Sequence, residues 1–357
     1  MKKSLFALFF LLSFALIATA QAPSNYYNAA NGLTGNQLKA ALHNIIKGHT
    51  SLSYSATMDA FAYTDHRQNN ALQVWDMYSD IPGGTPPYVY YHGQDNCGNY
   101  DSEGDCYNRE HSWPQSWFGT DATAKTDLHH LFPTDGFVNS KRGNNAFGEV
   151  RSASWTSRNG SKLGPCKTSG FTGTVFEPID EYKGDFARAL MYMSVRYYTE
   201  DASWSTSDMT TKSEIKSWAI QLLMRWNEQD PVSQKEIDRN NVIYSGYQHN
   251  RNPFIDHPDY ARMIWDPTWN TVEEEMDAIS LFPNPIERGQ VLHLGGNIHR
   301  FDAVVICDLF GRTVFSVAGN AVEEHAITLP NDLSRGCYIV KLMRNGGVVK
   351  YEKLLVK

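Results

Sequence analysis

The sequence has no excess of basic residues. Lysine and arginine together number 32 against 39 aspartates and glutamates, which gives a formal net charge of −7. A protein that coats nucleic acid through a uniformly basic surface is therefore excluded. Any group in this chain that handles phosphate must lie in a local site, with fixed hydrogen-bond donors or a metal ion.

Cysteine is scarce and no C-x-x-C pair occurs, so a zinc site built from thiolates is not expected. The five cysteines are Cys97, Cys106, Cys166, Cys307 and Cys337. Cys97 and Cys106 lie at the two ends of a loop rich in glycine and aspartate, and they could close a small disulfide in an exported protein. The odd total means that at least one thiol is unpaired or pairs elsewhere.

Long apolar runs are absent after the N-terminus, and we expect no stable membrane span, because a span needs about 20 apolar residues. The N-terminus itself is different. Lys2 and Lys3 precede an apolar run over residues 5–17, and the small residues Ala18-Thr19-Ala20 follow it. This order is typical of a secretory signal peptide. We predict removal of residues 1–20 and a secreted protein, extracellular or at the cell surface.

The length of 357 residues and the 41% hydrophobic content predict two packed domains. Apolar residues at helical spacing predict helices over residues 35–47, 185–198 and 212–226. Thr34 and Gln37 have the spacing of a capping box for the first of these helices. Asp230 and Pro231 are typical of the cap and first turn of a further helix.

Residues 51–107 are rich in turn-forming residues, and long loops are expected there, with short extended segments at 74–77 and 88–91. After the acidic Glu273-Glu274-Glu275 the chain instead alternates short β segments with turns. The expected strands cover residues 291–294, 303–310, 312–317, 325–329, 337–343 and 348–356. Short strands at this spacing predict a small β-sandwich.

Together these patterns predict an α+β protein. A mostly helical domain covers residues 21–270, a linker covers 271–279, and a small all-β sandwich covers 280–357.

Residues 108–150 hold the densest cluster of potentially catalytic side chains. Phosphodiester hydrolysis needs a base for water, a hard cation and donors that hold the phosphate, and all three kinds of group occur here. Glu110 and Asn139 offer the oxygen ligands that Mg²⁺ prefers. His111 can act as the base, and Arg142 is a candidate for a phosphate contact through its planar fork of donors.

This part of the chain resembles the bacterial extracellular and periplasmic endonuclease I family, nonspecific nucleases with a ββα-metal or His-Me finger site. The resemblance covers about residues 35–270. The matching motifs are Arg109-Glu110-His111, Trp113-Pro114, Asp127-Leu128-His129, Val138-Asn139 and Arg142-Gly143-Asn144.

The resemblance implies a ββα-metal motif and a mechanism. His111 would be the general base, and Glu110 and Asn139 would be the direct ligands of one divalent ion, Mg²⁺ or another divalent cation. The products would carry 5′-phosphate ends. We expect DNA as the substrate, leave RNA open as a second one, and expect a monomer.

The chain also departs from the pattern of some relatives. It has Lys125 where they carry an acidic residue, and it lacks a disulfide-linked insertion that supplies an arginine to the transition state. Arg109 and Arg142 are the possible substitutes for that arginine. Arg109, Lys141 and Asn144 are the further candidates for binding substrate.

The C-terminal segment resembles the sorting tails of type IX secretion substrates. The matching features are LFPNP at residues 281–285 and the basic final strand. The resemblance implies that the type IX secretion machinery is a partner and that the tail is removed after export.

Two other functions remain open. One is an exported glycan- or protein-binding surface protein without turnover, in which the polar cluster only stabilises a loop. The other is a hydrolase of different phosphodiesters or of phosphomonoesters. His129 and His130 could suggest zinc, but no third ligand accompanies them at a recognised spacing, and a structural role is favoured.

Overall fold

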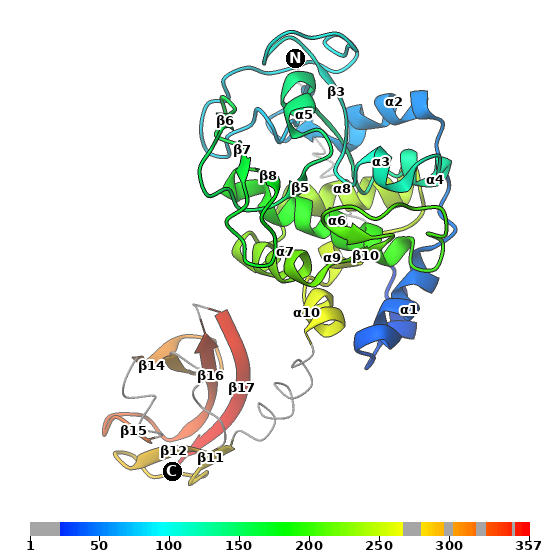
Figure 1. Ribbon diagram of the computed structural model, residues 1–357. Coiled ribbons are helices and arrows are strands. Elements are labelled where there is room, and N and C mark those ends of the chain that lie inside the picture. The colour runs from blue at the N-terminus through cyan, green and yellow to red at the C-terminus, as the bar shows by residue number, and fades with distance from the viewer. Residues whose placement is uncertain (1–21, 267–279, 296–302, 319–325, 345–346) are drawn as a thin grey trace, which may run out of the picture. The chain divides into compact units, whose positions relative to one another are not determined.

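The computed structural model describes residues 22–266, 280–295, 303–318, 326–344 and 347–357. The chain divides into two compact units, Met1–Asp266 and Pro267–Lys357, which are described separately (Figure 1). The signal peptide predicted for residues 1–20 and the linker predicted for 271–279 lie outside the described residues. Within the described ranges, no helix is both long enough and apolar enough to cross a bilayer.

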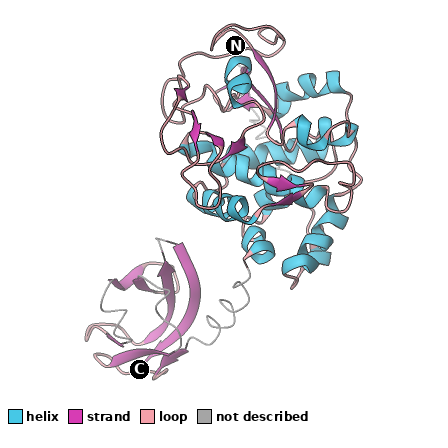
Figure 2. Ribbon diagram, in the orientation of Figure 1, coloured by secondary structure: helices cyan, strands magenta, loops and turns pink. Residues whose placement is uncertain are grey.

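Helices form most of the regular structure of the first unit, among short strands (Figure 2). The α-helices are α1 (Gly35–Ile46), α2 (Tyr54–Thr64), α3 (Gln115–Phe118), α4 (Ala122–Lys125), α5 (Gly136–Arg142), α6 (Lys183–Arg196), α7 (Ser217–Gln229), α8 (Gln234–Gly246), α9 (Pro253–Asp256) and α10 (Tyr260–Trp265). The 3-10 helices are η1 (Asn28–Ala30) and η2 (Asp180–Tyr182).

Helix α6 lies at the centre of this unit and packs against α1, α7 and α9 (Figure 1). All of its residues are buried. Its buried charges have partners, since Arg188 donates to both carboxylate oxygens of Glu236, at 2.6 and 2.9 Å. The unit is therefore built around a buried helix whose central arginine is paired with a carboxylate.

The helices predicted near residues 35–47 and 185–198 are confirmed as α1 and α6. The capping box predicted for α1 is wrong, because the Thr34 side chain makes no capping hydrogen bond. The helix predicted from residue 212 starts only at Ser217, because the preceding residues form a hairpin of β9 (Thr210–Thr211) and β10 (Glu214–Ile215).

The helix start predicted at Asp230 and Pro231 is also wrong. Asp230 is the C-cap of α7. Helix α8 begins four residues later, at Gln234, and its N-cap Ser233 exchanges side-chain and backbone hydrogen bonds with Glu236 in a capping box. Ser233 and Glu236 each satisfy one backbone amide at the helix start, so this pair caps α8 better than Asp230 alone would.

Helix α2 lies where the sequence predicted loops. Its buried residues are Thr57, Ala60, Phe61 and Thr64, which have the i, i+3, i+4, i+7 spacing of an amphipathic helix. Two of the four are threonines, so a search for apolar residues alone does not detect the pattern.

The two extended segments predicted nearby form little regular structure. Residues 74–77 contribute only Val74 to β2 (Asn70–Val74), which pairs with β1 (His66–Arg67). Residues 88–91 meet β2 through a single bridge between Gln73 and Tyr91.

The remaining strands of the first unit form two sheets. One has the order β5-β8-β7-β6, formed by Ala146–Phe147, Thr174–Glu177, Lys162–Pro165 and Trp155–Thr156. The other is the antiparallel pair of β3 (Tyr107–His111) and β4 (Leu131–Asp135). Helix α5 follows β4 directly, and Asp135 caps it by accepting from the Val138 amide at 2.8 Å. This strand pair and helix carry the chemical cluster identified in the sequence.

A disulfide joins Cys97 to Cys106 and closes the loop that leads into β3. This is the pairing that the sequence allowed. Cys166, Cys307 and Cys337 are free thiols in the described chain, the first two of them buried.

In its described residues, the second unit forms two antiparallel sheets. The three-stranded sheet has the order β11 (Ser280–Phe282), β12 (Val291–Gly295) and β15 (Ala326–Thr328). The four-stranded sheet has the order β14 (Thr313–Ala318), β13 (Ala303–Cys307), β16 (Gly336–Arg344) and β17 (Gly347–Val356). Alternate residues of both sheets, such as Leu292, Val304 and Val340, enter one apolar core. All six predicted strands are present, and β11 is an addition.

Candidate active site

The β3–β4 pair and α5 bring three of the predicted residues together. Glu110 and His111 are neighbours at the end of β3, so their side chains leave opposite faces of the strand. Asn139 reaches β3 from α5, and its amide nitrogen donates to the Arg109 carbonyl at 3.1 Å and to Asn108 Oδ1 at 2.8 Å. Because these bonds use the amide nitrogen, the side-chain oxygen of Asn139 is the atom left for a cation.

Glu110 is 1% exposed, and one of its oxygens has two partners. Oε1 accepts from the Tyr78 hydroxyl at 2.9 Å and lies 3.2 Å from Nη1 of Arg142. Burial raises the pKa of Glu110, while Arg142 and Tyr78 act in the opposite direction. A buried carboxylate whose charge is only partly compensated favours an additional cation, and both described contacts leave Oε2 for it.

His111 is held in one tautomer. Its Nε2 lies 3.0 Å from the Lys125 carbonyl at the end of α4. A carbonyl only accepts, so Nε2 carries the hydrogen and Nδ1 of the neutral ring is the acceptor. Burial and then the charge of His130 lower the pKa of His111 to about 3, although the hydrogen bond to the Lys125 carbonyl acts in the opposite direction. The ring is therefore neutral at physiological pH, with Nδ1 as its acceptor.

Arg142 lies inside the protein, at 1% exposure. Its guanidinium donates to the His111 carbonyl at 2.9 Å and to the Ser112 carbonyl at 2.7 Å, in addition to its contact with Glu110. The direct phosphate contact that the sequence suggested does not match this position. Arg142 instead holds the end of β3, from which Glu110 and His111 project.

The candidate substrate-binding residues have separate contacts. Arg109 donates to Thr57 Oγ1 and to the Tyr54 carbonyl, both at 2.8 Å. Lys141 lies over the Phe137 ring, with Nζ 4.9 Å from the centroid, and Asn144 is exposed just after α5. In the described structure, neither of the latter two has a hydrogen bond or ion pair to Glu110, His111 or Asn139.

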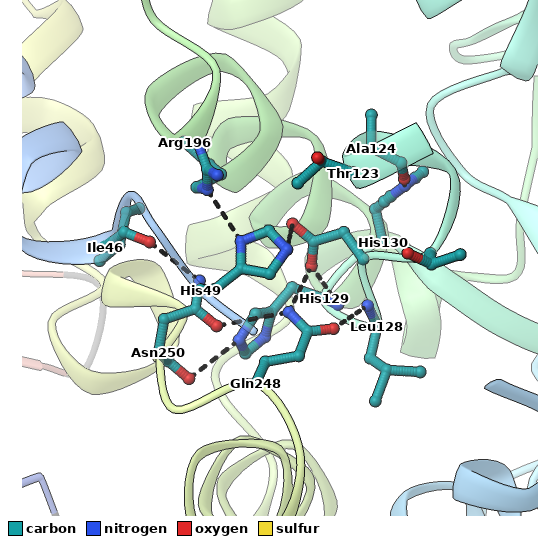
Figure 3. A network of polar contacts seen from close by, with 12 residues as sticks. Ile46, His49, Thr123, Ala124, Leu128, His129, His130, Arg196, Gln248 and Asn250 are labelled. Atoms are coloured by element: carbon teal, nitrogen blue, oxygen red, sulfur yellow. Dashed lines mark hydrogen bonds and ion pairs between the residues drawn. The ribbon is translucent and has the colours of Figure 1, made fainter. Parts of the chain in front are cut away.

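A buried polar network holds residues 127–130, which follow α4 (Figure 3). Its centre is Asp127, which is fully buried. One carboxylate oxygen accepts from the hydroxyls of Tyr192 at 2.8 Å and Tyr197 at 3.1 Å, and the other accepts from the His129 amide at 3.0 Å and the Gln248 side chain at 2.9 Å. Four donors of this kind stabilise the ionised carboxylate.

The pKa of Asp127 is accordingly lowered. Burial opposes ionisation, but His49, His129, His130 and the Gln248 hydrogen bond outweigh it. His49 is in turn held by Arg196, whose Nε donates to Nδ1 at 2.9 Å (Figure 3). The network therefore anchors the chain between α4 and β4 through partners that come from distant helices.

His129 and His130 belong to this network. Nε2 of His129 bonds the Asn250 carbonyl at 3.2 Å, and Nε2 of His130 bonds the Ala124 carbonyl at 2.7 Å. Among the described residues, no three histidines, cysteines, aspartates or glutamates are grouped as a metal site would require. The structural role favoured from the sequence agrees with these contacts. A magnesium site with one carboxylate and one amide would not form such a group, since Mg²⁺ keeps several waters.

Two contributors were not identified from the sequence: the Tyr78 hydroxyl and the Lys125 carbonyl. Tyr78 is separated from Glu110 by 32 positions, and no local pattern marks it. A carbonyl oxygen exists at every position, so only the fold shows which one meets His111.

Comparison with known proteins gives two family matches. Residues 34–259 match the Endonuclease I family, and residues 280–357 match the Secretion system C-terminal sorting domain. An extracellular ribonuclease of Bacillus amyloliquefaciens is 41% identical over 258 residues, which cover 71% of this chain and 82% of the relative. An extracellular ribonuclease of Bacillus subtilis is 40% identical over 267 residues, 71% of this chain and 83% of that protein. Endonuclease-1 of Buchnera aphidicola is 30% identical over 132 residues, 37% of this chain and 46% of the relative.

Proposed function

Because the chain belongs to the Endonuclease I family, we propose that it is a secreted endonuclease that hydrolyses phosphodiester bonds of DNA, and of RNA as a second substrate, without sequence preference. The observation that carries the proposal is His111, fixed by the Lys125 carbonyl at 3.0 Å beside Glu110 and Asn139. The relatives named extracellular ribonucleases are the reason for testing RNA alongside DNA.

The proposed base is His111. With Nε2 bonded to the Lys125 carbonyl, Nδ1 is the atom that takes the proton from the attacking water. Arg142 holds the carbonyl of the same residue and the Glu110 carboxylate, so it positions both groups without contacting substrate. The product ends follow from attack of water on phosphorus with departure of the 3′ oxygen, which leaves 5′-phosphate ends.

The residues present fit a hard divalent cation, for which we propose Mg²⁺. Glu110 and the side-chain oxygen of Asn139 would hold it, and β3, β4 and α5 would then be a ββα-metal motif. When bound, the cation would stabilise negative charge on the phosphate and on the departing oxygen. Arg109, Lys141 and Asn144 are the proposed substrate-binding residues.

We propose a separate role for each part of the chain. Residues 1–20 direct export, 21–270 carry the nuclease, 271–279 are a linker, and 280–357 are the sorting domain. The sorting-domain match makes the chain a secreted protein, and the type IX machinery is the partner that such a domain engages. We propose that the nuclease acts as a monomer.

A plasmid assay on residues 21–357, which lack only the predicted signal peptide, tests this function. Supercoiled DNA in Mg²⁺ is expected to be nicked and then degraded, EDTA is expected to stop the reaction, and fragments should accept a ligase because they carry 5′-phosphates. His111→Ala is expected to lower the rate by about 10²- to 10⁴-fold, the usual contribution of a positioned base. His293→Ala, which changes an exposed histidine of the second unit, is the matched control.

Equal cutting by the His111→Ala protein would remove His111 from the mechanism. If neither DNA nor RNA is hydrolysed and a glycan binds tightly, the protein is an exported binding protein instead.

A further inference from the structure

Two positively charged side chains lie against the ring of Tyr54, an exposed tyrosine beside His111. Tyr54, the first residue of α2, is 41% exposed. Its ring lies parallel to that of His111, with centroids 6.5 Å apart and an interplanar angle of 10°. The Arg109 guanidinium carbon lies 4.1 Å from the centroid of the Tyr54 ring, and Lys125 Nζ lies 4.5 Å from it. We call Tyr54, Arg109 and Lys125 the tyrosine–cation cluster.

Neither cation of this cluster is neutralised by a carboxylate. Among the described residues, no aspartate or glutamate oxygen lies within ion-pair distance of Arg109 or Lys125. Most other arginines of the first unit are paired, as in Arg67–Asp80, Arg188–Glu236, Arg196–Glu200, Arg239–Asp65 and Arg251–Asp256. Two unpaired cations that share one ring in an acidic protein repel each other, so this arrangement favours an anionic ligand.

Hydrogen bonds hold the cluster in place before any ligand arrives. Arg109 donates to Thr57 Oγ1 and to the Tyr54 carbonyl, which fixes its guanidinium against the start of α2. Lys125 is fixed at its backbone, because its carbonyl bonds His111. The side chains that carry the charges are therefore tied to the same backbone that orients the proposed base.

We propose that the tyrosine–cation cluster binds the phosphate next to the scissile one in a polynucleotide chain. Arg109 and Lys125 contact the anion, and Tyr54 keeps the two cations together through cation–π attraction. This rests on the proposed function, because the scissile phosphate is the one at His111. It adds Tyr54 and Lys125 to the substrate-binding residues and makes a chain of several nucleotides, rather than a single phosphodiester, the preferred substrate.

Two oligothymidine substrates distinguish the contribution of the tyrosine–cation cluster from that of the reacting centre. A dinucleotide has only the scissile phosphate, whereas a hexanucleotide also has its neighbours. Tyr54→Leu and Lys125→Met are expected to raise KM for the hexanucleotide about tenfold, with kcat changed less than twofold, and to leave kcat/KM for the dinucleotide unchanged. Tyr54→Phe keeps the ring and should behave as the unchanged protein does. Tyr63→Leu, on the same helix and 65% exposed, is the matched control.

Binding measured without turnover makes the result independent of the proposed function. In the His111→Ala background, fluorescence anisotropy with a labelled hexanucleotide should show a Kd about tenfold higher for Tyr54→Leu or Lys125→Met. The slope of log Kd against log salt should decrease by about 0.7 for the lost lysine on a single strand. If the proposed function is wrong, the unchanged protein leaves both substrates uncut. The difference in Kd can still be measured in that case, so the two proposals are tested separately.

The proposal is overturned if the hexanucleotide binds Tyr54→Leu and Lys125→Met as it binds the unchanged protein. It is also overturned if both substrates lose kcat/KM equally, because the cluster would then act only by supporting His111. Should Tyr54→Leu fail to fold, as judged by circular dichroism and thermal melting, Lys125→Met decides the matter, since its side chain is partly exposed and its carbonyl is retained.

Discussion

Glu110 shows how a single buried residue depends on partners that are distant in sequence. Tyr78 donates to its Oε1 at 2.9 Å, and the Tyr78 ring is itself fully buried. Residues that orient a metal ligand typically change metal affinity or activity by 10- to 100-fold when they are lost. The hydroxyl of Tyr78 therefore belongs to the proposed site although it would touch neither metal nor substrate.

Tyr78→Phe removes this hydroxyl and keeps the ring. We expect the Mg²⁺ concentration for half-maximal activity to rise about tenfold, because Glu110 loses a donor that fixes its orientation. A titration of activity against Mg²⁺ measures the shift. Tyr63→Phe removes a hydroxyl from an exposed ring and should leave the titration unchanged. Identical titrations for both variants would show that Tyr78 has no such role.

At the scale of the element, the order β3, β4, α5 explains how the site is assembled. The chain returns antiparallel so that Glu110 lies opposite Phe132. Asp135 then starts α5, and one turn later Asn139 reaches back to the Arg109 carbonyl. Asp121 likewise starts α4 by accepting from the Thr123 and Ala124 amides, which places the Lys125 carbonyl against His111. Both aspartates are capping residues.

The N-cap of helix α8 lies outside the proposed active site, so its contribution to stability can be tested separately from activity. Its Ser233 accepts from the Glu236 amide at 3.2 Å and completes the capping box. Ser233→Ala is expected to lower the free energy of unfolding by about 1 kcal/mol, because one amide at the helix start loses its acceptor. Urea unfolding measures the loss. Nuclease activity should not change, and a loss of activity with unchanged stability would contradict the structural assignment.

At the scale of the whole molecule, some of the acidic side chains that give the protein its negative charge are buried near one another. Asp76 is 1% exposed and accepts from the backbone amides of Tyr78 at 2.8 Å and Asp135 at 3.1 Å. Burial, and then the charge of Asp135, raises the pKa of Asp76 to about 8 from the 3.8 of an ordinary aspartate. The folded protein thus holds a proton there that the unfolded chain releases.

This proton makes stability depend on pH. Because the folded pKa is raised, the contribution is complete below about pH 4, where both states are protonated. It is lost as the pH rises toward 8, with a slope of up to about 1.4 kcal/mol per pH unit, and is constant above that value. Free energies of unfolding from pH 4 to 9 should therefore fall more steeply for the unchanged protein than for Asp76→Asn. Asp59→Asn, at an exposed position, should keep the original slope, and parallel curves for all three proteins would contradict the assignment.

Local chemistry in the sequence was sufficient for several features of this protein. Helical periodicity located α1 and α6, strand and turn spacing located the strands of the second unit, and the two cysteines of one short loop indicated their own disulfide. The sequence also placed Glu110, His111 and Asn139 within a short stretch, and two strands with a helix suffice to bring such a stretch together. These features depend on residues close in the chain.

Only the tertiary structure decided what surrounds those residues. Tyr78 meets Glu110, Tyr54 meets His111 and Arg109, and Gln248 meets Asp127 across separations that no spacing rule records. It also placed Arg142 inside the protein, where its donors face carbonyls and Glu110 instead of solvent. The physical reason is that burial and hydrogen-bond partners are set by packing between distant segments. A side chain's chemical type states which bonds it can form, and the fold alone selects which of them it does form.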